Sequence, residues 1–172
     1  MKIKTIKVYS FDELSEEAKE KALQNWRNDN DMSFLKDEME ERLSELLKEN
    51  KIEGKGKCYY SLGYCQGDGA MFTGQFEWKS YSVDINHSGP YNHRYSKIID
   101  ISSLKTENDA KEEVYSKFES IYQSICKDLE DYGYSIIEKE ESEENIKEIF
   151  LINEYTFKFT IYFFFGIIFS LQ

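Results

Sequence analysis

Proline and glycine are scarce in this chain. Its 172 residues include one proline and nine glycines. Disordered segments, flexible linkers and collagen-like repeats are rich in one or both of these residues, so the composition excludes those classes. A chain of this length can bury a core without staples, and 16% aromatic residues supply large apolar side chains for it. We therefore expect a single domain over residues 1–172.

Cysteine is also rare. The three cysteines, Cys58, Cys65 and Cys126, are an odd number without paired spacing, which argues against a disulfide framework. No histidine is placed to activate one of them as a nucleophile, so they are interpreted as small apolar residues. The basic N-terminus has no apolar stretch of the kind found in signal peptides. We expect a cytoplasmic protein with free thiols.

Long apolar runs are missing too. The longest apolar region, the tail from Tyr155 to Leu171, falls short of the roughly 20 residues that a membrane-spanning helix needs. Its alternation from Tyr155 to Ile161 predicts a strand or hairpin that closes the sheet, with Phe163, Phe164 and Phe165 forming a sticky edge if exposed. No membrane partner is expected.

Negative charge, in contrast, is abundant and unevenly placed. The net charge is −11. Residues 1–50 hold 13 acidic and 9 basic side chains, residues 51–105 hold 5 and 7, and residues 106–172 hold 15 and 6. This balance disfavours direct binding to nucleic acid or to an anionic membrane. It favours a partner with a basic surface.

Apolar periodicity predicts the elements of the fold. Spacings of three and four residues predict helices over 15–27, 32–50, 108–132 and 142–153, with Ser15 as an N-cap and Gly133 as a C-cap. Alternation predicts strands over 3–10, 57–66, 70–78, 81–87 and 94–101, a short strand over 134–137, and a loop over 51–57. The expected class is α+β, a mostly antiparallel sheet of about five strands with three to four helices packed on it.

The segment Gly67-Asp68-Gly69 is the first candidate site. A glycine-rich turn can offer backbone amides to a phosphate, and Asp68 can hold a cation. However, the lysine of a P-loop is absent, and one carboxylate does not make a calcium loop. The favoured interpretation is a tight hairpin turn whose glycines supply positive φ.

The chain's two histidines, His87 and His93, share one segment with Tyr91 and Arg94. As an acid and a base they would suit phosphodiester hydrolysis, with Arg94 stabilising charge. A metal would need further ligands, and none but Asp84 stands near in sequence. The alternative without a catalytic or metal-binding role is a polar loop between strands. As a contact surface, a loop rich in Tyr, His and Arg has the composition of a binding hot spot.

Glutamates concentrate between residues 138 and 148. A carboxylate array of this kind can imitate nucleic acid and compete for the Lys/Arg groove of a nucleic-acid enzyme. The alternative is a solvated helix face partly neutralised by lysines. The six candidate residues are Glu138, Glu140, Glu141, Glu143, Glu144 and Glu148.

Two segments resemble known proteins. The run from Phe11 to Ala22, FDELSEEAKEKA, and the run from Ser61 to Ala70, SLGYCQGDGA, with a later SGPYNH from Ser88 to His93, are similar to segments of small uncharacterised phage and prophage proteins. The resemblance implies a phage or mobile-element accessory gene, and such genes often inhibit host defences. It brings no activity that transfers residue by residue, and the tail after Phe157 departs from the family pattern.

The leading hypothesis is therefore a non-enzymatic accessory protein that binds and inhibits a basic, nucleic-acid-handling host complex, such as a CRISPR effector, without a cofactor or metal. The first alternative is a module that binds a ligand or a protein through its loops. The second is a phosphodiester hydrolase that uses His87 and His93. The candidate loop residues are Tyr64, Gln66, Asp68, His87, Tyr91, His93 and Arg94.

Overall fold

The computed structural model describes residues 7–105, 111–161 and 167–171. The chain divides into two compact units. The larger unit is Met32–Ile136, and the smaller unit combines Met1–Asp31 with Ile137–Gln172. The expectation of a single domain stays a prediction.

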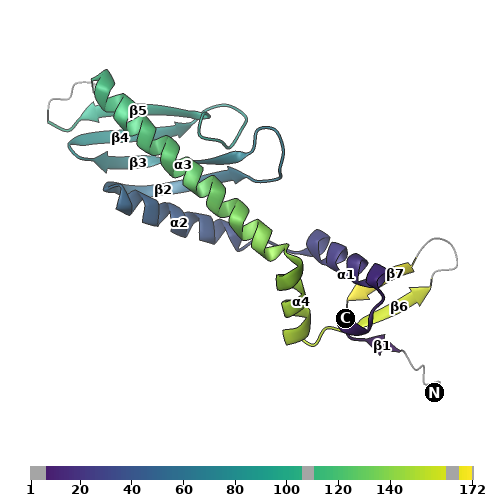
Figure 1. Ribbon diagram of the computed structural model, residues 1–172. Helices are drawn as coiled ribbons and strands as arrows, with labels where there is room; N and C mark the ends of the chain where they lie inside the picture. The colour runs from purple at the N-terminus through teal and green to yellow at the C-terminus, as the bar shows by residue number, and fades with distance from the viewer. Residues whose placement is uncertain (1–6, 106–110, 162–166, 172) are drawn as a thin grey trace, which may run out of the picture. The chain divides into compact units, whose positions relative to one another are not determined.

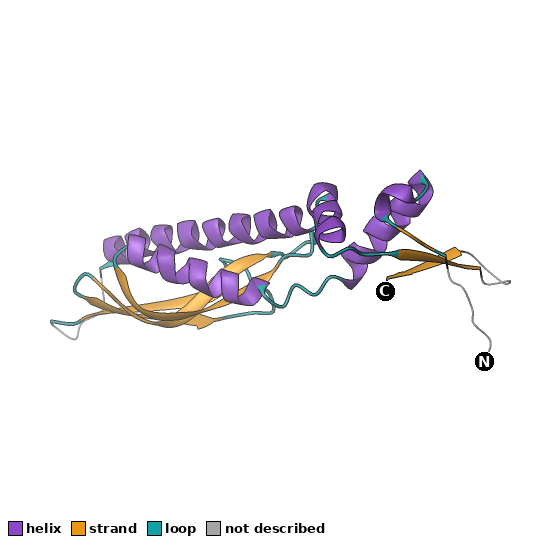
Figure 2. Ribbon diagram, turned by 90° about the horizontal axis from the view of Figure 1, so that it is seen from below, coloured by secondary structure: helices purple, strands orange, loops and turns teal. Residues whose placement is uncertain are grey.

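The larger unit is a four-stranded antiparallel sheet with two helices. The strands β2 (Ile52–Ser61), β3 (Gly69–Trp78), β4 (Tyr81–His87) and β5 (Lys97–Ser103) pair in chain order (Figure 1). The helices α2 (Leu35–Glu49) and α3 (Glu112–Glu140) lie on one side of this sheet (Figure 2). The antiparallel meander predicted from the strand spacing is thereby confirmed.

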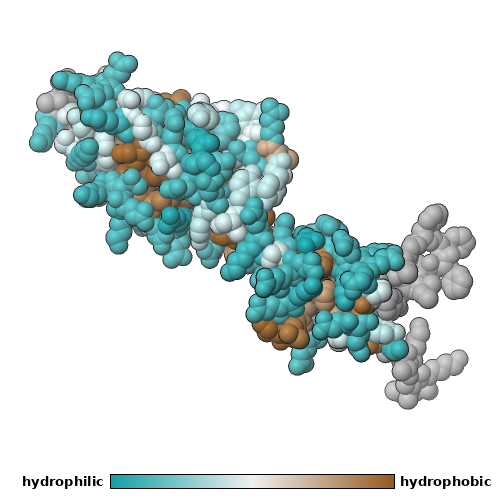
Figure 3. Space-filling model, in the orientation of Figure 1, coloured by the Kyte–Doolittle hydropathy of each residue, from teal (hydrophilic) through white to brown (hydrophobic). Residues whose placement is uncertain are grey.

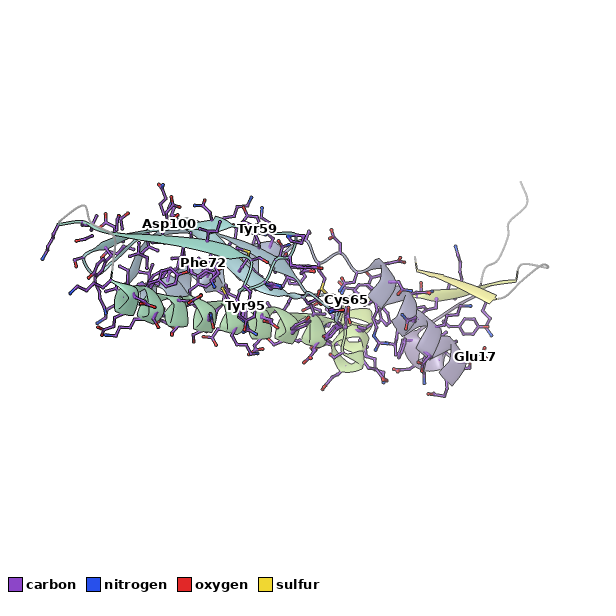
Figure 4. The ribbon with its side chains drawn as sticks, turned by 90° about the horizontal axis from the view of Figure 1, so that it is seen from above. Glu17, Tyr59, Cys65, Phe72, Tyr95 and Asp100 are labelled. Atoms are coloured by element: carbon purple, nitrogen blue, oxygen red, sulfur yellow. The ribbon has the colours of Figure 1, made fainter. Side chains whose placement is uncertain are left out.

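The core of the larger unit lies between the sheet and its helices. Apolar residues of alternate strand positions, among them Phe72, Trp78 and Ile85, are buried against the apolar stripes of α2 and α3. In Figure 4, Phe72 lies between the sheet and α3, whereas Tyr59 and Asp100 lie on the other side of the sheet. The predicted stripe of α2 is fully buried and comprises Leu35, Met39, Leu43, Leu46 and Leu47.

Two predictions in this unit are wrong, and both misread glycine. Residues 51–57 were expected to form a loop, but β2 begins at Ile52, and Gly54 and Gly56 make room for the ring of Phe76. Gly133 was expected to end a helix, but α3 continues to Glu140 and replaces the short strand predicted over 134–137. A Cβ on Gly133 would lie 2.4 Å from Leu62 Cδ1, so glycine there permits close packing of helix against loop.

The smaller unit contains three strands and several helical segments. The strands β1 (Val8–Tyr9), β6 (Phe157–Ile161) and β7 (Ile167–Leu171) form an antiparallel sheet in the order β1-β6-β7. The helical segments are the 3-10 turn η1 (Phe11–Glu13), α1 (Glu16–Asp29), the last residues of α3, and α4 (Glu143–Ile152). Ser15 and Ser142 cap α1 and α4 with their side chains.

Aromatic rings make up much of the smaller unit's core. Phe150 contacts the rings of Phe11, Trp26, Tyr155 and Phe157 at centroid distances of 5.3–5.7 Å. Leu14, Ala18, Ala22, Leu23 and Ile146 complete the buried cluster. The tail hairpin is confirmed, but it pairs with β1 in a sheet of its own instead of closing the larger one.

The predicted α+β class is therefore confirmed. The strands are divided between a four-stranded and a three-stranded sheet, where one sheet of about five had been expected. The start of the first predicted strand (3–6), the predicted helix start at 108–110 and Phe163–Phe165 lie outside the described residues. None of the described helices combines the length and apolar composition needed to cross a membrane.

Candidate functional site

Most of the candidate loop residues meet at one end of the larger unit. The β2–β3 loop (62–68) and the β4–β5 loop (88–96) leave the sheet at the same end (Figure 1). The two loops are in contact, since a Cβ on Gly67 would lie 2.8 Å from Tyr91 Cδ1. The β4–β5 loop also contacts the end of β2, where Asn92 Nδ2 donates to Tyr60 O at 3.2 Å. We call these two loops, with the residues of α3 that they contact, the loop end.

Asp68 organises the β2–β3 loop from within. Its Oδ2 accepts hydrogen bonds from the backbone N–H groups of Gly63 (2.7 Å) and Cys65 (2.8 Å), and its Oδ1 accepts from Ser61 Oγ (3.1 Å). Tyr134 Oη on α3 donates to Oδ2 at 2.9 Å. These bonds, led by the one from Cys65, lower the pKa of Asp68. Its carboxylate therefore holds the loop together from within and ties it to α3.

The predicted tight hairpin at Gly67-Asp68-Gly69 is also corrected. Ser61 pairs with Gly69, so the connection spans residues 62–68 and Asp68 closes it from inside. The expected positive φ is present, at +95° for Gly67 and +154° for Gly69. Glycine is needed at position 69 because a Cβ there would lie 2.7 Å from His93 Cβ.

Tyr134 links the loop end to α3, a role that the sequence did not reveal. Its ring lies 4.8 Å from the ring of Tyr64. Burial, followed by the hydrogen bond to Asp68, raises the pKa of Tyr134 to about 12, so it remains a donor at neutral pH. The missed signal is the helical period, which continues through Gly133.

The two histidines occupy separate sets of contacts. His87 Nε2 lies 3.3 Å from Asn92 Oδ1, and the His87 ring lies 5.6 Å from that of Tyr59. His93 Nδ1 accepts from the Tyr95 backbone N–H at 3.2 Å, and the His93 ring stacks on Tyr91 at 5.6 Å. Within the described residues, no hydrogen bond joins the two histidines. Each histidine therefore contacts and orients residues of the β4–β5 loop.

Arg94 also makes intramolecular contacts. Its guanidinium lies 3.8 Å from Glu130 Oε2 on α3 and 5.7 Å from the ring centroid of Tyr95. Gln66 is exposed in the neighbouring loop. The ion pair ties the β4–β5 loop to α3, much as Tyr134 ties the β2–β3 loop to it.

Three exposed tyrosines lie on the surface of the loop end. Tyr64, Tyr91 and Tyr95 are 63%, 52% and 65% exposed. Tyr95, which the sequence did not single out, makes an edge contact with His93. Aromatic side chains on loops held by internal bonds lose little entropy on binding, so this end presents a preorganised contact surface.

The acidic candidates lie in the smaller unit. Glu138 and Glu140 belong to the end of α3, Glu141 lies between the helices, and α4 carries the rest. Glu138, Glu143, Glu144 and Glu148 are exposed, whereas Glu140 and Glu141 are half-buried. We call residues 138–148 the acidic segment. A helix break at Glu141 and Ser142 interrupts it, so its carboxylates do not form one helical stripe.

Few of these carboxylates are neutralised. Lys147 pairs with Glu143 and lowers its pKa. Glu140 accepts a long hydrogen bond of 3.5 Å from Asn145 Nδ2. Within the described part of the chain, the remaining members form no ion pair; they are Glu138, Glu141, Glu144 and Glu148.

The cysteines differ in exposure. Cys58 and Cys126 are buried, and burial raises the pKa of each thiol to about 12. Cys65 is exposed in the β2–β3 loop, where its thiol donates to Gly63 O at 3.2 Å. The described residues contain no group of three or more His, Cys, Asp or Glu side chains that could hold a metal ion.

Comparison with known proteins gives no relative. No family model, curated protein or solved structure matches this chain. The similarity to phage and prophage proteins stays a prediction.

Proposed function

We propose that this chain is a non-enzymatic accessory protein of a phage or mobile element that inhibits a nucleic-acid-handling complex of the host, such as a CRISPR effector. In this proposal the acidic segment binds a basic surface of that complex. The supporting observation is the exposure of Glu138, Glu144 and Glu148 without a paired cation in the described residues.

The physical reasoning concerns what a Lys/Arg groove prefers. Such a groove is built to neutralise phosphates, and association with carboxylates releases counterions in a similar way. Carboxylates already paired within the protein would have to give up a partner before binding. The carboxylates of Glu138, Glu144 and Glu148 have no such ion pair to break before they bind. A net charge of −11 also attracts the protein toward cationic surfaces.

Neutralising the acidic segment tests the proposal. The test variant carries Glu138→Gln, Glu144→Gln and Glu148→Gln. The control carries Glu41→Gln, Glu53→Gln and Glu77→Gln, which are exposed residues of the larger unit and change the net charge equally. The readouts are the affinity for a labelled oligolysine peptide and the inhibition of DNA cleavage by a purified CRISPR effector.

The test variant is expected to lose about tenfold in affinity, since three surface ion pairs of about 0.2–1 kcal/mol each are removed. Native binding should weaken steeply between about 50 and about 300 mM salt, and the variant's salt dependence should be shallower. The control should behave as the native protein. Equal losses in both variants would reduce the effect to net charge and reject a specific acidic contact.

The loop end supports a second candidate function, a module that binds a protein or ligand. Its supporting observation is the exposure of Tyr64, Tyr91 and Tyr95 on loops anchored by Asp68 and Glu130. If this surface carries the function, Tyr91→Ser and Tyr95→Ser should abolish inhibition while the glutamine variants retain it.

A further inference from the structure

An apolar groove lies beside the acidic segment within the smaller unit. Residues of η1, α4 and the turn at 154–156 surround a volume of about 470 Å³. Its lining includes Phe11, Phe150 and Tyr155. A groove of this size accepts one or two large side chains, since ligand pockets typically span about 300–1,000 Å³.

The groove continues into exposed apolar surface at the end of α4. Leu151 lines the groove and is 74% exposed, and the adjacent Ile152 is also exposed. Figure 3 shows this apolar surface at the lower end of α4. Two aliphatic side chains left in water beside an apolar groove are a feature of binding surfaces, whereas isolated exposed residues are common.

The rim of the groove is acidic. Asp12, Glu148 and Glu154 line it. Among the described residues Lys147 is the one basic side chain in the lining, and it is already paired with Glu143 and placed 6.0 Å from the ring centroid of Phe11. The three rim carboxylates therefore outnumber the single lysine, and that lysine already forms an ion pair with Glu143.

Glu154 occupies a position that normally favours glycine. It follows the C-cap of α4 with φ of +53°, where Glu154 N–H donates to Leu151 O (3.2 Å) and Tyr155 N–H to Phe150 O (3.0 Å). This is a Schellman motif, whose left-handed residue is usually glycine because a Cβ is strained there. The chain thus carries a carboxylate on the groove rim at a backbone position that glycine would occupy with less strain.

From the apolar floor and the acidic rim we propose that the groove binds an apolar side chain of a partner segment that carries Lys or Arg on either side of it. This inference rests on the proposed function, since it places the apolar anchor of the same basic partner next to the acidic segment. The charge complementarity supplies orientation, and burial of the anchor supplies specificity.

Two labelled hexapeptides test the groove. Lys-Lys-Trp-Leu-Lys-Lys carries an apolar centre, and Lys-Lys-Ser-Ser-Lys-Lys has the same charge without it. By fluorescence anisotropy the native protein should prefer the first by about tenfold, the factor given by partial burial of the apolar side chains. Leu151→Ser should remove most of this preference. Leu104→Ser, which changes another exposed leucine that belongs to the larger unit, should retain it.

Glu154→Gly separates binding from stability. Relief of the left-handed strain should raise the denaturation midpoint of the smaller unit, while loss of the rim carboxylate should weaken binding of both peptides by about twofold to fivefold. A variant that is more stable and also binds as tightly as the native protein would reject a role for Glu154 in recognition.

The outcomes separate the two proposals. Equal, salt-sensitive binding of both peptides by the native protein would reject the groove and leave the acidic contact intact. Binding of either peptide without salt dependence would count against the proposed function. A concentration-dependent dimer that Leu151→Ser abolishes would show that a second copy fills the groove and would overturn the inference.

Discussion

Phe150 is the residue whose removal should most clearly damage the smaller unit. It is 2% exposed and lies among four aromatic rings, those of Phe11, Trp26, Tyr155 and Phe157. Three of these contacts, to Trp26, Tyr155 and Phe157, are edge-to-face, which is a favourable geometry for aromatic pairs. Phe150→Ala removes the centre of the cluster and leaves a cavity that its neighbours cannot fill without moving.

The expected cost is about 3–5 kcal/mol, the usual range for a buried Phe→Ala change. The upper part of the range applies here, because each aromatic pair adds about 0.5–1.5 kcal/mol to the burial term. A unit of this size is expected to have a total stability of roughly 3–10 kcal/mol. With a urea m-value of about 1–1.5 kcal/mol per molar, the midpoint should fall by about 2–5 M.

The two tryptophans allow each unit to be followed separately. Trp26 lies in the smaller unit and Trp78 in the larger unit, and the chain has no other tryptophan. Trp78→Phe leaves a reporter of the smaller unit, and Trp26→Phe leaves a reporter of the larger unit. Urea unfolding in these two backgrounds should show the shift caused by Phe150→Ala with Trp26 as reporter and little change with Trp78.

The neighbouring helix position supplies the control. Leu151→Ala changes a side chain that is 74% exposed, so its effect should stay within about 0.5 kcal/mol. If both tryptophans report the same shift with Phe150→Ala, the two units unfold in one cooperative transition, which contradicts the prediction. A cost below about 1 kcal/mol would refute the assignment of Phe150 as the centre of the core.

Two further predictions concern the larger unit. Asp68→Asn should increase hydrogen exchange in the β2–β3 loop and lower the thermal stability at neutral pH. Because the folded pKa of Asp68 is lowered, its carboxylate stabilises the fold above the unfolded pKa, and this stabilisation is lost as the pH falls through the folded pKa. The variant should therefore lose less stability than the native protein when the solution is made acidic. Thermal melts at pH 7 and in acid check this, and parallel curves for both proteins would contradict it. Iodoacetamide on the native protein should modify Cys65 and spare Cys58 and Cys126, whose thiols are buried with pKa values near 12, as mass spectrometry of the adducts can show. Equal labelling of all three would contradict the described burial.

Much of the fold could be predicted from local periodicity. The stripes of α1 and α2, the cap at Ser15 and the order of the four-stranded sheet all depend on residues close in sequence. The errors arose where a glycine leaves space for a side chain that is distant in sequence. Gly133 accommodates Leu62, and Gly54 accommodates Phe76, so their meaning depends on tertiary packing that no local pattern encodes.

The candidate sites show the same limit. The loops could be located from their turn residues, but the inward role of Asp68 depends on Tyr134, which lies on another element. The groove was not predicted at all, because its walls combine η1 with α4 and the turn that follows. Its aromatic floor and acidic rim are ordinary residues in sequence and gain meaning when the two segments meet.

The division of the chain also has a consequence for biosynthesis. The larger unit, Met32–Ile136, is continuous in sequence, whereas the smaller unit needs segments from both sides of it. During translation the meander of β2 to β5 and its helices can form from neighbouring segments as they leave the ribosome. Phe11 and Trp26 are synthesised first, and their rings stay uncovered until Phe150 and Phe157 have been synthesised. A nascent chain stalled before α4 would therefore expose an aromatic surface to chaperones and proteases, although its larger unit is already complete.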